Sequence, residues 1–301
     1  MPKSISPTEE KAMRRAGFLL SLTMIIGLSI NASAAEPIKA LIIDGQNNHA
    51  WAKTTPILKQ ILEESKLFTV DVATTPAKDT TGFAPKFSNY QVVISNYNGA
   101  DWPAETKSAF VEFVAKGGGF VSVHAANNSF GKWPEYNAMI GVGGWGGRTD
   151  KEGAYIRFKD GKIVRDESTG KVGSHGAKHA YVVELRDKEH PIVKGLPEKW
   201  LHASDELYDR LRGPAKNVTV LATAFADPAK GGSGANEPQL MVIEYEKGKV
   251  FHTTLGHDDT AMKCVGFRTT FARGTEWAAT GKVTQKVPED FPTADKLSTR
   301  P

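Results

Sequence analysis

The chain has 301 residues, of which 40% are hydrophobic and 24% charged, as is usual for a globular protein with a sizeable core. Its formal net charge is +4, and it carries no basic block of the kind that binds nucleic acid, so no nucleic-acid partner is expected. Cys264 is the single cysteine, which excludes an intramolecular disulfide framework.

The amino terminus, residues 1–34, is predicted to be a signal peptide. Two arginines at 14–15 precede an apolar run at 16–30, and small residues at 32–34 suit cleavage after Ala34. The run is shorter than the roughly twenty residues of a membrane span, which makes a retained anchor the weaker alternative. The arginine pair loosely resembles a twin-arginine signal, so two export routes stay open. We expect a periplasmic or secreted protein that is free of the membrane after cleavage.

Alternating strands and helices are predicted along residues 38–124. Apolar β-branched runs predict the strands, and apolar residues on one helical face predict the helices. This alternation implies right-handed crossovers and a mostly parallel sheet covered by helices on both faces. We therefore predict a three-layer α/β/α, doubly wound, flavodoxin-like fold. The predicted strands cover 38–45, 68–73, 90–95 and 120–123, and the predicted helices cover 55–65 and 104–116.

A glycine-rich segment, residues 141–148, comes next. It lacks the Lys-Ser/Thr of a phosphate loop and does not lie between a strand and a helix, so no nucleotide is expected there. Close backbone packing, or a lid that carries Trp145 and Arg148, is predicted instead, and the ring of Trp145 could stack on a sugar. Together with Asn127, these two residues are candidates for substrate binding.

The rest of the chain is predicted to add a hairpin, more strands and a last helix. Residues 154–165 are expected to form an inserted β-hairpin that turns at Asp160-Gly161. The folded domain is expected to cover 35–281, and the tail 282–301 is expected to be extended and loosely held. The further strands are predicted at 181–185, 218–225, 239–245 and 249–255, and the helix at 262–280.

Polar residues stand at the ends of several apolar strands. They are His49, His124, the pair Asp205-Glu206, and His257. Because side chains leave the core at strand ends and converge there, this pattern predicts one shared pocket. His124 is the first candidate for chemistry, since it follows a buried strand at a sharp turn, although such a histidine could instead only close the turn.

Imidazoles and a carboxylate in one pocket could serve two kinds of chemistry. His124, Glu206 and His257 could bind a divalent metal, zinc above all, and three such ligands leave one position open for water or substrate. Alternatively they could form an acid–base set, with Glu206 orienting a histidine. No local motif such as His-Glu-x-x-His is present, so the metal hypothesis depends on the predicted convergence. His49 and Asp205 are assigned supporting roles in substrate binding.

The other histidines and the cysteine are assigned lesser roles. His175 and His179 lie in a predicted loop, from which one could face the pocket. His202 is expected at the surface or in a cap, and His252 is expected to pack within a strand. Cys264 lies near a helix start, where a thiol can be activated, but no histidine nearby in the sequence partners it.

Five segments in order resemble the ThuA-like family, which is named for trehalose utilisation. They lie within residues 38–280, nearly all of the predicted mature chain. The family is similar in fold to the class I glutamine amidotransferases. The segments are residues 41–49, GGGFVSVHAA at 117–126, HPIVKGLP at 190–197, DELY at 205–208 and GKVFHTTLGH at 248–257.

The resemblance carries expectations about function. In the amidotransferases the strand-to-helix elbow carries a cysteine nucleophile, and His124 stands in its place, so thiolate chemistry is not expected. The family implies carbohydrate breakdown through 3-keto sugars, with a partner sugar dehydrogenase that oxidises carbon 3. His124 and His257 would then be acid–base or ligand residues, and Glu206 an orienting carboxylate or a ligand. The alternative is a non-catalytic carbohydrate-binding protein on the same fold.

Overall fold

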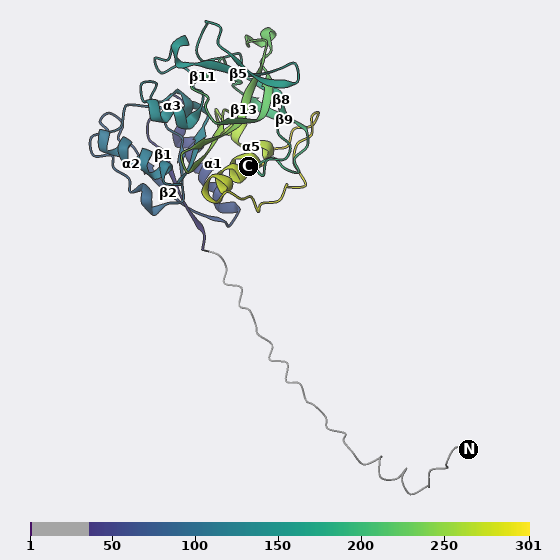
Figure 1. Ribbon diagram of the computed structural model, residues 1–301, viewed down its shortest axis with the longest axis horizontal. Coiled ribbons are helices and arrows are strands. Elements are labelled where there is room, and N and C mark those ends of the chain that lie inside the picture. The colour runs from purple at the N-terminus through teal and green to yellow at the C-terminus, as the bar shows by residue number, and fades with distance from the viewer. Residues whose placement is uncertain (2–35) are drawn as a thin grey trace. The chain divides into compact units, whose positions relative to one another are not determined.

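A mixed β-sheet forms the centre of residues Pro37–Pro301 in the computed structural model, which describes Met1 and residues 36–301 (Figure 1). Apart from Met1, the predicted signal peptide lies outside the described residues. Within the described part of the chain, no helix has the length and apolar character that crossing a bilayer requires.

Five parallel strands make up one half of the sheet. Their apolar side chains are buried on both faces, as for Ile42 and Ile43, because helices cover both sides. β1 lies between β2 and β3, so the chain winds outward in both directions from it, as predicted. In spatial order the strands are β2 (Phe68–Thr74), β1 (Ile38–Asp44), β3 (Val92–Ser95), β4 (Gly119–Val123) and β14 (Gly248–Thr253).

The other half of the sheet is antiparallel. It continues from β14 through β13 (Asn236–Tyr245), β12 (Val218–Phe225) and β8 (His179–Leu185) to β9 (Lys199–Asp205). Since direction reverses at each of these steps, β9 runs in the same direction as β14. The carboxyl end of β9 therefore lies at the same edge of the sheet as those of the parallel strands.

Short strands extend the antiparallel half of the sheet or lie beside it. The predicted hairpin insertion is confirmed: β5 (Ala154–Lys159) and β6 (Lys162–Asp166) pair with each other, and β5 also pairs with β13 and with β11 (Arg212–Gly213). A separate small sheet joins β7 (Ser174–His175) to β10 (Tyr208–Asp209).

Helices cover both faces of the sheet and complete the predicted three-layer fold. Side chains alternate along a strand, so in β4 Val121 belongs to one core and Phe120 to the other. The Val121 core includes Leu58 and Phe271 from the helices of its face, and the Phe120 core includes Phe110 and Met139. The first face carries α1 (Trp51–Glu64), α4 (Asp259–Met262) and α5 (Val265–Thr280), and the second carries α2 (Ala104–Ala115) and α3 (Pro134–Ile140).

Two predicted elements differ in the structure. The helix expected at 262–280 is α5, which begins at Val265, whereas Met262 ends the separate short helix α4. Between the two helices, the Cys264 backbone forms a bridge with Thr299 of the tail. The tail is not loosely held: Phe291 is buried and its ring lies 5.6 Å from that of Trp200. Pairing with the tail and apolar burial thus hold residues 282–301 against the domain.

Candidate functional site

Glu206 lies at the centre of four histidines at the carboxyl edge of the sheet. Its Oε2 is 3.6 Å from Nε2 of His49, which follows β1, and 3.6 Å from Nε2 of His124, which follows β4. Its Oε1 is 3.4 Å from Nε2 of His257, which follows β14, and 3.7 Å from Nε2 of His175 in β7. The predicted convergence of strand ends is therefore present, and we call these five residues the Glu206 cluster.

His124 occupies the sharp turn after β4. It begins a short 3-10 helix, η2 (His124–Asn128), and its φ of +46° is a conformation that non-glycine residues rarely adopt and that recurs at functional sites. Its Nδ1 lies 2.6 Å from the carbonyl oxygen of Thr254, which can only accept, so Nδ1 carries the proton and donates it. Its Nε2 is buried without a hydrogen-bond partner and faces Glu206. This is the tautomer that a metal-binding histidine requires.

Asp205 holds the backbone of the cluster in place. Its Oδ1 accepts hydrogen bonds from the backbone N–H groups of Glu206 and His257, at 2.8 and 3.1 Å. Its Oδ2 accepts from the Gly256 N–H at 2.8 Å and from His202 Nε2 at 2.9 Å. Asp205 is fully buried, and each of its carboxylate oxygens accepts two hydrogen bonds from the protein. Asp205 therefore does not have the predicted role of binding substrate. It positions the backbone of Glu206 and His257 instead.

His202 contacts Asp205 beside the cluster, and its predicted location is wrong. The sequence predicts it at the surface or in a cap, but it lies in β9 and is fully buried. Burial opposes its charged form, yet Cys264 and the Asp205 carboxylate outweigh that effect and raise its pKa to about 10. Cys264 itself is also fully buried, which removes it from contact with any substrate. Since tertiary packing alone brings β9 and the start of α5 together, no local sequence signal indicates this contact.

The charges of the cluster follow from its surroundings. Burial alone would raise the pKa of Glu206, but the imidazoles of His124, His49 and His257 lower it well below its usual range. Burial, aided by His124, lowers the pKa of His257 to about 4. At neutral pH the pocket therefore presents a carboxylate and an uncharged His257.

Three members of the cluster fit a metal ion. Ligand atoms of His49, His124 and Glu206 all lie within 4.8 Å of one another. The 3.6 Å between each imidazole nitrogen and the carboxylate is too long for a hydrogen bond. It is close to the roughly 3.3–3.4 Å that separates two ligands, each about 2.0–2.1 Å from zinc, in a tetrahedral site. The set thus differs in one member from the predicted one, because His49 joins it while His257 lies beside it.

A pocket of about 260 Å³ opens beside the cluster. It lies where the chain winds outward from β1 in both directions, the usual place for a ligand in a doubly wound sheet. Asn48 after β1 and Asn98 after β3 contribute to it, as does Asn128 of η2. Trp145 and Tyr208 form an aromatic wall, with ring centroids 4.8 Å apart. Trp145 thus lines the pocket, as predicted for a substrate-binding residue.

Two other predicted substrate-binding residues serve the protein interior instead. The five N–H groups of Arg148 donate to Asn137 Oδ1 and to backbone carbonyl oxygens, and burial lowers the pKa of Arg148 to about 10. Asn127 is fully buried, and its amide donates to Nε2 of His252 at 3.0 Å. His252 is fully buried in β14, which confirms that it packs within a strand. Arg148 therefore has no side-chain donor left for a substrate, and burial keeps the Asn127 amide from reaching one.

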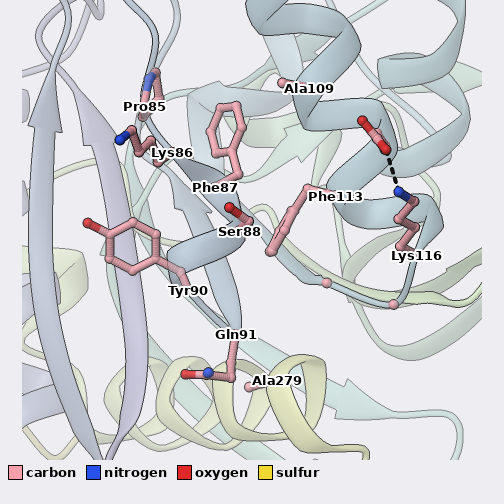
Figure 2. A pocket seen from close by; sticks show the side chains of 13 residues that line it. Pro85, Lys86, Phe87, Ser88, Tyr90, Gln91, Ala109, Phe113, Lys116 and Ala279 are labelled. Carbon is pink, nitrogen blue, oxygen red and sulfur yellow. Dashed lines mark hydrogen bonds and ion pairs between the residues drawn. The ribbon is translucent and has the colours of Figure 1, made fainter.

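A larger pocket lies at the opposite edge of the sheet, near the amino ends of β3 and β4 (Figure 2). Its volume is about 670 Å³, and Figure 2 shows Phe87 of η1 (Phe87–Asn89), Phe113 of α2 and Tyr90 around it. Its charged residues are Lys86 and the ion pair of Glu112 with Lys116, and no histidine lines it. The convergent histidines and the carboxylate are thus at the Glu206 cluster and not at this larger pocket.

The comparisons with known proteins agree with the fold. A family model, ThuA, described as trehalose utilisation, matches residues 39–278. A crystal structure of a protein described as ThuA-like from Parabacteroides merdae is 52% identical, with a TM-score of 0.86 over 88% of this chain and 98% of that one. A second such protein, from Bacteroides uniformis, is 18% identical, with a TM-score of 0.54 over 84% and 96%, and supports the fold alone. No match was found among curated proteins.

Proposed function

The chain belongs to the ThuA family, and on this premise we propose that it is an exported protein that acts on a glycoside or a 3-keto sugar at the Glu206 cluster. The family indicates a role in carbohydrate metabolism. The observation that carries the proposed chemistry is the buried, partnerless Nε2 of His124, which faces the Glu206 carboxylate at 3.6 Å. An imidazole nitrogen and a carboxylate oxygen that face each other beyond hydrogen-bond distance leave room for a shared cation between them.

His49, His124 and Glu206 would hold a divalent metal, with zinc as the best match to two imidazoles and a carboxylate. When bound, such an ion supplies Lewis-acid polarisation of a sugar oxygen. The Nδ1–H of His124, bonded to the Thr254 carbonyl, keeps Nε2 free as a ligand, and Asp205 fixes the backbone of Glu206. These contacts pre-organise the set before a substrate arrives.

His257 is the group assigned to proton transfer. It lies outside the proposed ligand set, and its Nε2 is 3.4 Å from Glu206 Oε1. A ketone at carbon 3 makes the proton on carbon 2 acidic, and Nε2 of His257 would accept that proton. The electron pair left on carbon 2 can then expel the glycosidic oxygen from carbon 1, and this oxygen would leave as a hydroxyl by taking the proton from His257, which is an elimination. Return of the proton at a neighbouring atom would instead isomerise the sugar.

The 3-keto sugar must come from another enzyme. A sugar dehydrogenase that oxidises carbon 3 of a glycoside would supply the ketone and is the partner that we propose. His124 stands at the strand-to-helix elbow and the single cysteine, Cys264, is buried, so the cysteine nucleophile of amidotransferase chemistry has no counterpart at this elbow. The lowered pKa of His257 supports an enzyme over a non-catalytic sugar-binding protein, because strongly perturbed groups cluster at active sites.

Metal analysis tests the proposal most directly. Elemental analysis of the purified protein should give about one equivalent of zinc or another transition metal, and His124→Ala should lose it. His190→Ala is the matched control, since His190 packs on Trp277 of α5 outside the cluster and should leave the metal content unchanged. Absence of metal from the wild type, or an equal content in His124→Ala, would contradict the metal site. Turnover of 3-keto glycosides, lost in His257→Ala, would then test the acid–base part separately.

A further inference from the structure

Gln239 is a fully buried residue of β13 that does not line the pocket, yet it contacts two residues that hold His124. One is Thr254, whose carbonyl oxygen accepts the hydrogen bond from His124 Nδ1. The other is Tyr208, whose ring lies against the His124 ring with the two centroids 4.0 Å apart. A substitution of Gln239 would therefore act on His124 without removing a group that lines the pocket.

The side-chain amide of Gln239 has one orientation that suits its neighbours. Its Nε2 lies 3.3 Å from the carbonyl oxygen of Tyr208 and 3.3 Å from that of Glu237. Because carbonyl oxygens only accept hydrogen bonds, the NH2 group must face them, and Oε1 must face Thr254. Oε1 then accepts the hydrogen bond of the Thr254 hydroxyl, at 2.6 Å. The amide thus joins β10 to the segment that follows β14.

Thr254 is attached to Gln239 at two points. It is the first residue after β14, next to the last pair of the β13–β14 ladder, which joins Leu240 to Thr253. Its backbone N–H donates to the Gln239 carbonyl oxygen at 3.0 Å, and its hydroxyl donates to the Gln239 side chain. Two attachments fix the direction of the Thr254 carbonyl group, which would otherwise belong to a free turn.

The direction of that carbonyl group decides which nitrogen of His124 carries the proton. A neutral imidazole has one N–H, and the hydrogen bond that this N–H makes sets the tautomer. With the Thr254 carbonyl in place, the proton is held on Nδ1. Without it, the Glu206 carboxylate, 3.6 Å from Nε2, would attract the proton to Nε2. A nitrogen that carries a proton has no lone pair left to bind a metal ion.

We infer that Gln239 is a positioning residue of the proposed metal site: acting through Thr254 and Tyr208, it keeps Nε2 of His124 free to bind the ion. The inference rests on the proposed function for the presence of the ion. The tautomer of His124, however, is a property of the metal-free protein. The positioning role and the metal site can therefore be tested separately.

Long-range proton–nitrogen correlation spectra of the metal-free protein at mildly alkaline pH measure the tautomer, and His124→Gln assigns the signals. The wild type should carry the proton of His124 on Nδ1. Thr254→Val removes the hydroxyl bond to Gln239 and should move the proton toward Nε2, whereas Thr254→Ser keeps the hydroxyl and should restore the wild-type spectrum. A proton on Nε2 in the wild type, or an unchanged tautomer in both Thr254→Val and Gln239→Leu, would overturn the inference.

Zinc affinity, measured by competition with a chromophoric chelator, is the second readout. Gln239→Leu should bind zinc about tenfold or more weakly than the wild type, and so should Thr254→Val, which serves if Gln239→Leu fails to fold. Thr275→Val is the matched control, because this fully buried hydroxyl donates to the Phe271 carbonyl oxygen within α5.

The control separates positioning from a general loss of stability. Thr275→Val should lower the unfolding midpoint about as much as Thr254→Val does, yet bind zinc as the wild type does. An equal loss of zinc affinity in the two variants would mean that Thr254 and Gln239 act only on stability, which contradicts the inference. If the wild type binds no zinc, the proposed metal site fails, and the tautomer alone decides whether Gln239 positions His124.

Discussion

Replacement of Asp205 by asparagine is expected to be among the most destabilising single-atom changes in this protein. The Asp205 carboxylate accepts three backbone N–H groups, from Glu206, Gly256 and His257, and one from the His202 imidazole. Asparagine can accept on one side only, because its other side carries an NH2 donor.

The cost can be worked out from these contacts. In its better orientation, the introduced amide would keep the two bonds at Oδ1 and turn its NH2 toward the Gly256 N–H and His202. The Gly256 N–H then lacks a partner inside the protein, which costs about 1–3 kcal/mol, and the charge-assisted bond to His202 is worth about 1.5–3 kcal/mol. We therefore expect the free energy of unfolding to fall by about 3–5 kcal/mol, in line with the loss of a buried charge partner.

Urea unfolding at pH 7, followed by circular dichroism, measures this quantity. Asp209→Asn is the matched control: Asp209 is also fully buried and nearby in the chain, but its two side-chain hydrogen bonds come from the partly exposed Arg210, and burial raises its pKa. Its replacement should cost about 1 kcal/mol. The reasoning would be refuted if the free energy of unfolding of Asp205→Asn were within about 1 kcal/mol of the wild-type value, or larger than that of Asp209→Asn. Asp205 would then not hold the backbone of the cluster in place.

Three further outcomes follow from buried residues away from the ligand set. Burial holds His252 neutral and lowers its pKa to about 4, so the unfolded chain takes up a proton first as pH falls below about 6.5. The free energy of unfolding should therefore fall by about 3 kcal/mol between pH 6.5 and 4, and His252→Gln should lose less over that range, as urea unfolding at pH 6.5 and 4 would reveal. Arg148→Met leaves the acceptors on Asn137 and on the loop carbonyls unpaired and should lower the free energy of unfolding by about 3 kcal/mol or more, whereas an exposed Lys151→Met should not change it measurably. Phe291→Ala removes a ring packed on Trp200 and should lower stability by about 2–4 kcal/mol; a wild-type melting temperature would mean that the tail contributes nothing to the fold.

Much of the fold could be predicted because its strands and helices depend on local sequence patterns. β-branched runs such as that of β1, and one-sided apolar helices such as α2, depend on neighbours only a few residues away. The alternation of strand and helix then permits few topologies, since parallel crossovers are right-handed. The same reasoning placed His49, His124 and His257 at one edge, because parallel strands end together.

Tertiary structure decided which side chains are available for chemistry. Arg148, Asn127 and His202 look like site or surface residues along the sequence, but each is buried in the folded chain. The Asn127 amide, for example, donates to His252, which lies 125 residues later. His175 reaches Glu206 only because β7 pairs with β10, a contact between segments over thirty residues apart. Composition and periodicity determine where strands and helices form, since these depend on local burial and backbone geometry. The partners of a buried polar group depend on packing between distant elements, and only the folded chain specifies them.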